Sequence, residues 1–471
     1  MRRNIVFVLL VLFTNALHSP GATPEAIYSA QLKHELEAVR DAALVDNYAY
    51  QELSHLTDQI GGRPTGSHEA EAAVEYVAGE MRHLGLAVRL EDVQVPHWVR
   101  ATDSAELVEY PGQPHGSAQK IFITALGGNT PTAPNGIIAD VVVVASFDEL
   151  KAQGADKVRG KIVLFDVAFD QQKAAAGYAG QAYGEAVAYR LNGAKEAAAM
   201  GAVAVLIRSV GGADYRLPHT GFSAPAGIPA GAVASEDAGL IARLAAVGKV
   251  RMHLVLMSEN GPDVTSHNVI ADLRGAERPE QVVIVSGHLD SWDLGTGAID
   301  DGAGVAIAME TAELVQQLHL KLRRTIRVVA WMDEENGGRG SEAYGHDYQA
   351  EFGNYVAAIE SDLGAAHPLG FEGKITPEAQ ALLRPVQDIL QKFGASVINL
   401  STRSPGADIA VLAKAGVPTF GIMQDGRTYF NYHHSAADTL DKVVPQELRE
   451  NAAAMAVMAV ALADLPEALP R

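Results

Sequence analysis

Short apolar runs alternate with longer helical patterns through the second half of the chain, from about residue 264 onward. Four of these runs are typical of buried strands, at residues 282–285, 325–332, 355–359 and 417–423. Segments with helical spacing lie between and after them, near residues 303–318, 375–393, 409–415 and 445–465. Alternation of this kind predicts a three-layer α/β domain, in which helices cover both faces of a mixed, largely parallel sheet.

Helical spacing also dominates the first hundred residues. Apolar residues recur every three or four positions between residues 24 and about 62, and again between 69 and 83. The second pattern stops at Gly85, a residue type that helix C-termini favour because it adopts a left-handed conformation without strain. The run 86–90 then indicates a strand. We therefore assign residues 23–110 to the N-terminal part of the same α/β domain.

The composition of the chain changes between about residues 111 and 260. This stretch is rich in Gly and Ala, and its short apolar runs are separated by turns and one Ala-rich helix. It contains no clustered pattern of His and carboxylate residues. We interpret it as an inserted domain, followed by the main part of the α/β domain at residues 261–471. Residues 160–165 and 228–232 resemble segments of the protease-associated (PA) domain, which is found inserted in several exopeptidases.

The first 22 residues have the layout of a secretory signal peptide. Arg2 and Arg3 precede the apolar run 5–13, and small residues follow up to Ala22. The run is shorter than the roughly 20 residues that a membrane-spanning helix needs, so an uncleaved anchor is the weaker alternative. The sequence therefore predicts a secreted or periplasmic protein with no stable membrane insertion after signal removal.

The charge and the cysteine content of the chain limit the partners and metal ligands that it can have. The 57 acidic and 37 basic side chains give a formal net charge of -20, which disfavours a nucleic-acid partner because phosphate would be repelled. The 471 residues include no cysteine, so thiolate nucleophiles, Cys-type zinc sites and iron–sulfur clusters are excluded. A metal ion would have to be bound by His, Asp and Glu.

Side chains that can bind metals follow each of the four predicted strands. They are, strand by strand, His288 with Asp290, Glu334 with Glu335, Asp362, and His433 with His434. Ligands of open α/β sheets gather at the carboxyl ends of the strands. One such residue alone is ordinarily a solvated turn residue, but their joint occurrence, together with Asp300 and Asp301 in a loop, predicts a metal site.

A hydrolytic site with two metal ions needs an oxygen ligand shared by ions that are about 3.5–4 Å apart. Asp300 is the natural bridging ligand. We assign His288 and Asp362 to one ion and Glu335 and His434 to the other, so that each ion receives one imidazole. Carboxylate and imidazole ligands without sulfur favour Zn²⁺, two per chain, with manganese or cobalt as substitutes.

Of the two adjacent glutamates, one can bind metal while the other accepts a proton from the attacking water and passes it to the leaving amine. We assign the catalytic base to Glu334, although the spacing also permits the reverse assignment with Glu335. Asp290 lies two residues after His288, so in an extended segment its carboxylate would accept the second imidazole N–H. We therefore assign Asp290 a supporting catalytic role.

Two further features of the last loop have alternative interpretations. Asp438, four residues after His434, is either a hydrogen-bond partner of that imidazole or, in better agreement with the residues that follow it, a helix N-cap. Tyr429, Phe430 and Tyr432 are candidates for the wall of the pocket, although aromatic residues near a strand end commonly serve packing alone.

The motifs around these residues resemble those of the co-catalytic zinc aminopeptidase and exopeptidase family, in particular its carboxypeptidase Q-like branch. The motifs are SGHLDSWD at 286–293, DDG at 300–302, EE at 334–335 followed by GG at 337–338, ESD at 360–362, and HHS at 433–435 with DT at 438–439. The resemblance implies a phosphorylase/hydrolase-like fold with an inserted PA domain, two zinc ions and hydrolysis of dipeptides or short peptides. It also implies the ligands and base assigned above, a cis peptide bond between Asp300 and Asp301, and a homodimer.

Three alternatives remain open. A broad aminopeptidase of the same family would use the same metal ligands, a glutaminyl cyclase-type acyltransferase would use a single zinc ion, and a non-catalytic binding module would use the fold alone. The residue inventory does not settle which end of the peptide is bound. Arg339, Arg403 and Arg427 could grip a substrate carboxylate, but each is typical of a solvated loop.

Overall fold

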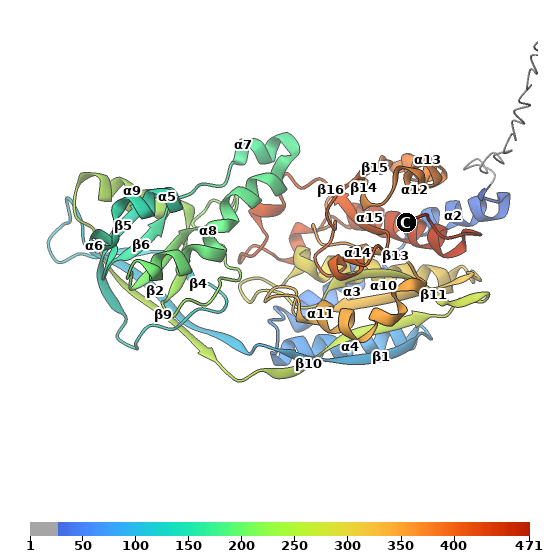
Figure 1. Cartoon of the computed structure of the whole chain (residues 1–471), viewed down its shortest axis with the longest axis horizontal. Coiled ribbons are helices and arrows are strands. Elements are labelled where there is room, and N and C mark those ends of the chain that lie inside the picture. Colours follow the sequence, from blue (N-terminus) through green and yellow to red (C-terminus); the bar gives the residue numbers. More distant parts are fainter. Residues whose placement is uncertain (1–26) are drawn as a thin grey trace, which may run out of the picture.

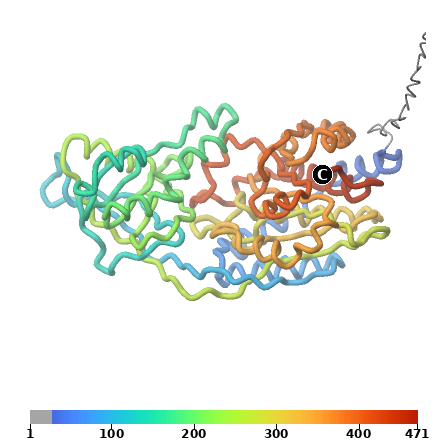
Figure 2. Tube along the Cα trace, in the orientation of Figure 1, coloured from blue at the N-terminus to red at the C-terminus, as the bar shows by residue number. Residues whose placement is uncertain are grey.

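The computed structural model describes residues 27–471, so the predicted signal peptide at residues 1–22 lies outside the described part of the chain. These residues form two lobes, each built around one eight-stranded sheet (Figure 1). The trace in Figure 2 shows that the middle of the sequence forms one lobe, while the blue, yellow and red segments form the other. Within residues 27–471, no helix combines the length and the apolar character needed to cross a membrane.

The larger lobe contains the sheet β1-β10-β12-β11-β13-β16-β14-β15. The strands are β1 (Ala87–Val95), β10 (Val264–Leu273), β11 (Arg278–His288), β12 (Arg324–Trp331), β13 (Tyr355–Glu360), β14 (Pro368–Lys374), β15 (Val397–Leu400) and β16 (Thr419–Gln424). The four central strands β12, β11, β13 and β16 run parallel, and antiparallel pairs flank them. The predicted mixed α/β sheet is confirmed, and the carboxyl ends of its central strands share one edge.

Helices cover both faces of this sheet. The helices on one face are α2 (Ala30–Ala43), α3 (Tyr48–Ser54), α4 (His68–His83), α10 (Ala303–Gln317), α12 (Pro377–Leu382), α13 (Arg384–Leu390) and α15 (Pro445–Asp464). The opposite face is covered by α11 (Arg339–Asp347) and α14 (Ala410–Lys414), over a core that includes Trp331 and Tyr344. Small side chains suit α15 because it is buried on nearly every side between the sheet and α2.

The inserted lobe, residues 98–260, contains the sheet β3-β2-β9-β5-β6-β7-β8-β4. Its strands are β2 (Trp98–Glu109), β3 (Gln119–Ile121), β4 (Ile123–Ala125), β5 (Ile137–Val144), β6 (Ile162–Phe165), β7 (Ala204–Arg208), β8 (Ala230–Val233) and β9 (Arg251–Asn260). Its helices are α5 (Phe147–Gln153), α6 (Ala155–Val158), α7 (Gln171–Lys173), α8 (Ala179–Ala199) and α9 (Ser235–Val247).

The second sheet begins earlier than the predicted boundary at residue 111. Strand β2 pairs with β9 and β3 of the inserted lobe, so this lobe starts at Trp98. Only Pro96 and His97 separate β2 from β1, which belongs to the other sheet. The composition of the chain does not change between these two strands. The pattern of residues therefore does not indicate that the chain passes from one sheet to the other here.

The inserted lobe reaches the larger lobe at the carboxyl edge of the first sheet. Two backbone hydrogen bonds join them there, from Gly212 N–H to the Phe430 carbonyl at 2.9 Å and from Thr220 N–H to the His434 carbonyl at 2.9 Å. Helix α8 extends toward the same edge (Figure 1). The two lobes therefore meet where the predicted metal ligands lie.

Candidate metal centre

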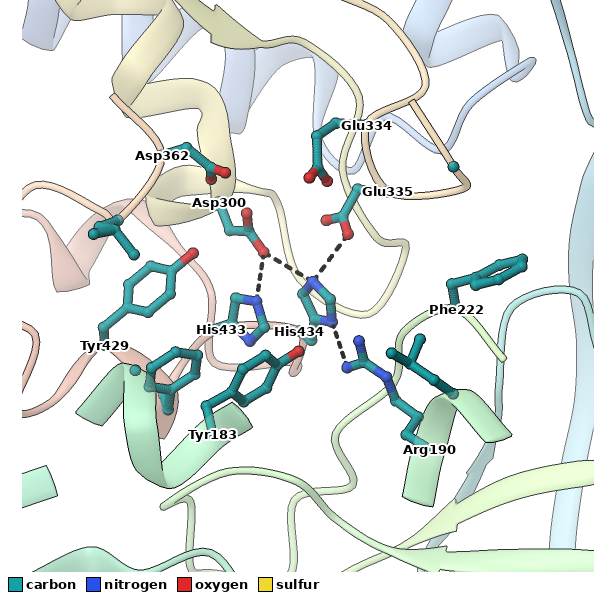
Figure 3. A pocket seen from close by; sticks show the side chains of 15 residues that line it. Tyr183, Arg190, Phe222, Asp300, Glu334, Glu335, Asp362, Tyr429, His433 and His434 are labelled. Carbon is teal, nitrogen blue, oxygen red and sulfur yellow. Dashed lines mark hydrogen bonds and ion pairs between the residues drawn. The ribbon is translucent and has the colours of Figure 1, made fainter. Parts of the chain in front are cut away.

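The carboxyl ends of the four central strands bring the predicted site residues together. His288 is the last residue of β11, Asp290 and Asp300 lie in the segment that follows it, and the other predicted residues lie in the loops that follow β12, β13 and β16. Figure 3 shows that Asp300, Glu334, Glu335, Asp362 and His434 surround one cavity. Parallel pairing of these strands explains why residues distant in sequence converge here.

Asp300 lies between two pairs of potential ligands. Its Oδ1 is 3.2 Å from His288 Nε2, which is in turn 3.4 Å from Asp362 Oδ1. Its Oδ2 is 3.1 Å from His434 Nε2, which is 2.9 Å from Glu335 Oε2. Each carboxylate oxygen of Asp300 therefore faces the imidazole of one pair, and the imidazole of each pair faces one further carboxylate. This is the arrangement that a bridging carboxylate between two cations requires.

The spacing of these atoms also fits the size of a zinc ion. When ligand atoms lie about 2.0–2.1 Å from a tetrahedral zinc ion, they lie about 3.3 Å from one another. Contacts of 2.9–3.4 Å between the facing nitrogen and oxygen atoms are close to that value. In addition, Asp300 Oδ2 and Glu335 Oε1 are buried without a hydrogen-bond partner. The site therefore has unsatisfied acceptors at the positions where cations would bind.

The charge balance of the site favours a cation as well. Burial raises the pKa of Glu335 to about 6, and it raises the pKa values of Glu334 and Asp362 above their usual range. Burial would do the same to Asp300, but His433 and the other imidazoles that face it hold its pKa well below the ordinary value. Because burial penalises the charged form of these carboxyl groups, divalent ions bound beside them would stabilise the carboxylates.

The peptide bond between Asp300 and Asp301 is cis, as the resemblance implies. The two side chains point to different partners. Asp301 accepts hydrogen bonds from the N–H groups of His288 and Gly304, both at 3.0 Å, while Asp300 faces the cavity. Asp301 therefore holds the end of β11 and the start of α10 together beneath the site.

Asp290 supports a different part of the site from the one predicted. The Nδ1 atom of His288 faces the backbone carbonyl of Asp290 at 2.9 Å, and the carboxylate is 3.9 Å away. The carboxylate instead accepts N–H bonds from Asp333, Glu334 and Glu335 at 2.8, 3.2 and 3.3 Å. Strand β11 ends at His288, so the extended geometry behind the prediction does not continue to Asp290. Its carboxylate positions the loop that contains both glutamates.

Asp438 also differs from both predicted roles. Its Oδ1 accepts hydrogen bonds from the N–H groups of Ala298 and Ile299, each at 2.8 Å. It makes no hydrogen bond to the His434 imidazole, and the N-cap position of the short turn 440–442 belongs to Thr439 and not to Asp438. Asp438 instead fixes the segment that leads into Asp300.

The early turn at residues 61–67 anchors the same loops. The Arg63 guanidinium is fully buried and donates hydrogen bonds to the carbonyl groups of Leu289, Thr296 and Gly297 at 2.8, 2.7 and 2.9 Å. Thr65 donates its hydroxyl to Asp290 Oδ2 at 2.8 Å. The turn therefore holds the segment 289–297 that leads from β11 to Asp300.

The sequence assigned no individual role to two histidines near the site, His433 and His219. His433 stacks on His434 with ring centroids 3.6 Å apart, and its Nε2 lies 3.3 Å from Asp300 Oδ2. His219 of the inserted lobe contacts His433 Nδ1 at 3.0 Å. Burial and the neighbouring His433 lower the pKa of His219 well below its ordinary value, so it is neutral. The His433–His434 pair was a visible signal, whereas His219 lies in a segment without a clustered pattern.

A tryptophan positions Glu335, one of the predicted metal ligands. Trp292 donates its indole N–H to Glu335 Oε2 at 2.6 Å. This residue belongs to the motif at 286–293, but an indole is not a metal ligand, and the sequence alone did not assign it a role. Packing explains the neighbouring Gly127, where a Cβ atom would overlap the Trp292 ring.

The cavity has a volume of about 470 Å³ and is lined by both lobes. Tyr429 and Phe430 form part of its wall, as predicted, while Tyr432 lies outside it. The inserted lobe contributes Tyr183, Arg190 and Phe222 (Figure 3). The three arginines considered from the sequence lie elsewhere: Arg339 and Arg427 pair with Asp263 and Asp425, and Arg403 is exposed.

Comparisons with known proteins find relatives that match nearly the full length of this chain, including both lobes. The profile of peptidase family M28 matches residues 268–459. Carboxypeptidase Q of Bos taurus is 36% identical, and the match covers 98% of this chain and 99% of the relative. The crystal structure of the peptidase M28 precursor from Shewanella amazonensis SB2B superposes with a TM-score of 0.88 at 34% identity, covering 94% of this chain and 98% of that one.

A more distant solved structure shares the fold. BSAP, a zinc aminopeptidase from Bacillus subtilis, superposes with a TM-score of 0.62 at 20% identity, covering 88% of this chain and 94% of that chain. Both lobes are therefore arranged as in solved peptidase structures. The match to the family profile includes all five predicted metal ligands and Glu334.

Proposed function

Because this chain belongs to peptidase family M28, with carboxypeptidase Q among its relatives, we propose that it is an exported di-zinc metalloexopeptidase that hydrolyses dipeptides or short peptides. The observation that carries the proposal is the placement of Asp300, whose two oxygens face two separate sets of ligands. The single-zinc alternative, a glutaminyl cyclase-type acyltransferase, is less well supported because it would leave one of these sets unused.

His288 and Asp362 would hold one zinc ion, and His434 and Glu335 the other, with Asp300 shared between them. Imidazole nitrogens and carboxylate oxygens without sulfur are the ligands that such zinc sites use. When bound, zinc would polarise the scissile carbonyl and lower the pKa of the attacking water. A non-catalytic binding module is disfavoured because every ligand position is occupied by a suitable side chain.

Glu334 is the residue that we propose to move the proton. Its side chain lines the cavity beside Glu335 but is not among the residues paired with His434 or His288 (Figure 3). Burial raises the pKa of the Glu334 carboxyl well above its usual range, which suits a group that accepts a proton and then donates it. The hydrogen bond from the Glu334 N–H to the Asp290 carboxylate fixes the backbone from which the Glu334 side chain extends.

The size and enclosure of the cavity support short substrates. A volume of about 470 Å³ lies at the lower end of the roughly 300–1,000 Å³ range of small-molecule sites. The inserted lobe covers one side of the cavity with Tyr183 and Phe222, which limits how far a peptide can extend past the metal ligands. A broad aminopeptidase of the same family remains the second candidate function.

Export, domain identity and assembly belong to the same proposal. Residues 1–22 would be a signal peptide that directs the chain to the periplasm or the exterior. The inserted lobe would be a PA-like domain. Residues 23–110 and 261–471 were predicted as the two parts of the peptidase domain, and the first of these parts now ends before Trp98. By resemblance to the carboxypeptidase Q branch we also propose a homodimer, which sedimentation analysis of the purified protein would test.

Metal removal and return would test the peptidase proposal. We expect hydrolysis of unblocked dipeptides to disappear after exhaustive chelation and to return when about two zinc ions per chain are restored, as measured by product formation and elemental analysis. Glu334→Gln serves as the matched control, because it should bind zinc normally and remain inactive. Full activity after thorough chelation would contradict the metal mechanism, and inactivity of the zinc-loaded protein toward all dipeptides would contradict peptidase activity.

A further inference from the structure

Arg100 joins the two lobes at a point outside the metal centre. It lies on β2 of the inserted lobe, and its guanidinium donates two hydrogen bonds to Asp293 of the larger lobe. These bonds run from Nε to Oδ2 at 2.6 Å and from Nη2 to Oδ1 at 2.9 Å. The Arg100 side chain is 10% exposed, so this ion pair is largely shielded from water. A paired contact of this kind fixes the relative orientation of the two groups as well as their distance.

The same guanidinium is also bound on the side of the inserted lobe. Its Nη1 donates to Asp103, Thr124 and the Ala125 carbonyl at 3.1, 2.6 and 2.6 Å. Its Nη2 donates to the Thr220 hydroxyl at 3.1 Å. A lysine could not make these contacts together with the pair to the larger lobe, because all its donors share one nitrogen. Arg100 therefore fixes Thr220 relative to the larger lobe.

Thr220 connects Arg100 to one proposed metal ligand. The Thr220 N–H donates to the His434 carbonyl at 2.9 Å, and the Thr220 carbonyl lies 3.3 Å from His434 Nδ1. If Nε2 of His434 is to bind metal, the ring proton must sit on Nδ1, where it donates to the Thr220 carbonyl. Thr220 therefore orients the imidazole, and Arg100 holds Thr220 in place through its hydroxyl.

Trp292, the neighbour of Asp293 in the sequence, connects Arg100 to a second ligand. Its indole N–H donates to Glu335 Oε2 at 2.6 Å. Although Trp292 belongs to the larger lobe, its ring packs into the apolar core of the inserted lobe, with its centroid 6.1 Å from that of Trp98. The guanidinium carbon of Arg100 lies 4.9 Å from the centre of the Trp98 ring. Arg100 therefore contacts both the residue beside Trp292 and the ring against which Trp292 packs.

Both connections end at the same proposed ion. His434 and Glu335 are 2.9 Å apart and would hold one zinc ion together with the bridging aspartate. The other ion would be held by His288 and Asp362. Among the described residues, the side chains of His288 and Asp362 make their hydrogen bonds and ion pairs within the larger lobe. The inserted lobe therefore supports one ion and not the other.

We propose that Arg100 is a positioning residue through which the inserted lobe controls the affinity of the ion held by His434 and Glu335. This inference rests on the proposed di-zinc function and adds to it an unequal dependence of the two ions on contact between the lobes. Separation of the lobes would break the pair with Asp293, weaken this ion and leave the other bound. The site would therefore be complete only while the lobes are in contact.

Zinc titration in competition with a chelator would test this role. The wild type should bind two zinc ions. We expect Arg100→Lys and Asp293→Asn each to weaken one ion about 10- to 100-fold, the range typical of residues that orient metal ligands, and to leave the other at its wild-type affinity. Arg208→Met is the matched control, because Arg208 is a partly buried arginine that pairs with Asp166 within the inserted lobe at 2.9 Å. It should leave both affinities unchanged.

Double variants would identify the ion that is affected. Asp362→Asn removes a ligand of the ion that Arg100 does not support, so adding Arg100→Lys to it should weaken the remaining ion about 10- to 100-fold. Glu335→Gln removes a ligand of the supported ion, so adding Arg100→Lys to it should leave the remaining ion at the affinity measured in Glu335→Gln alone.

The inference is overturned if Arg100→Lys leaves both ions at wild-type affinity, if it weakens both by the same factor, or if the two double variants show the reverse pattern. Circular dichroism identifies a misfolded Arg100→Lys protein. In that case Asp293→Asn decides, because it keeps the contacts of Arg100 inside the inserted lobe. A wild type that binds fewer than two zinc ions when fully loaded would instead contradict the proposed di-zinc site.

Discussion

Replacing Asp290 with asparagine tests whether its carboxylate positions the two glutamates of the site. Oδ1 accepts N–H bonds from Asp333 and Glu334, while Oδ2 accepts bonds from the Glu335 N–H and the Thr65 hydroxyl. An amide presents only one oxygen, so at least one buried N–H group would face another donor. Each unpaired buried group costs about 1–3 kcal/mol, and the remaining bonds lose their charge-assisted strength.

A displaced glutamate loop should affect the reaction more than the stability of the whole chain. We expect Asp290→Asn to lower kcat about 10- to 100-fold, the range typical of residues that orient metal ligands. The assay is dipeptide hydrolysis with zinc added until activity no longer rises, together with elemental analysis of bound zinc. Thr65→Val is the control, because it removes one of the four bonds to Asp290 and keeps the side-chain shape, so its kcat should fall only a few-fold.

Two results would refute this reasoning. If excess zinc restores the kcat of Asp290→Asn fully, Asp290 acts only on metal affinity, as its predicted contact with His288 would have required. If Thr65→Val and Asp290→Asn lower kcat equally, the loss reflects the turn at residues 61–67 and not the bonds to the glutamate loop.

Four further substitutions have distinct expected outcomes. Glu334→Gln should lower kcat about 10²- to 10⁴-fold with zinc retained, whereas Glu335→Gln should lower zinc content; the opposite pattern would exchange their roles. Trp292→Phe removes the N–H bond to Glu335, so equilibrium dialysis should show weaker zinc binding, and unchanged affinity would contradict the contact. Burial raises the pKa of Glu310 to about 8, from 4.5 when unfolded, so the folded protein binds an extra proton and loses stability as pH rises between these values. Between pH 5 and pH 8, the free energy of unfolding of Glu310→Gln should therefore rise by about 3 kcal/mol relative to that of the wild type, as measured in denaturant titrations. A difference that does not change with pH would refute this expectation.

The sequence predicted the fold of the larger lobe because its signals are local. A period of two or 3.6 residues marks each strand or helix, and parallel pairing follows from their alternation. The convergence of His288, Glu335, Asp362 and His434 followed from the same reasoning, since parallel strands share their carboxyl edge. These predictions needed no knowledge of how distant loops pack.

The predictions that differed from the structure depended on geometry beyond the strand ends. Asp290 was assigned to His288 on the assumption of an extended segment, but β11 ends at His288 and the chain turns. Asp438 was assigned to its neighbours in sequence, whereas it binds the backbone at Ala298 and Ile299. In each case the residue was correctly singled out, and its partner lay in a loop that pattern analysis does not position.

The residues that the inserted lobe contributes to the site could not be predicted from the sequence, for a different reason. Arg190 and His219 are single polar residues in an Ala- and Gly-rich stretch, and nothing in their local sequence distinguishes them from surface residues. They lie at the site where residues 212 and 220 bond to the backbone of the last loop. Their role depends on the arrangement of two lobes, which is a property of the whole chain.

That arrangement couples the two lobes at a proposed metal ligand. All proposed metal ligands come from the larger lobe, whereas Arg190 and Thr220 come from the inserted lobe. His434 joins the lobes, because its backbone carbonyl and its Nδ1 both contact Thr220, which also accepts a bond from Arg190. A shift of the inserted lobe would therefore disturb a proposed metal ligand. It follows that an open arrangement of the lobes would bind zinc less tightly than the one described here.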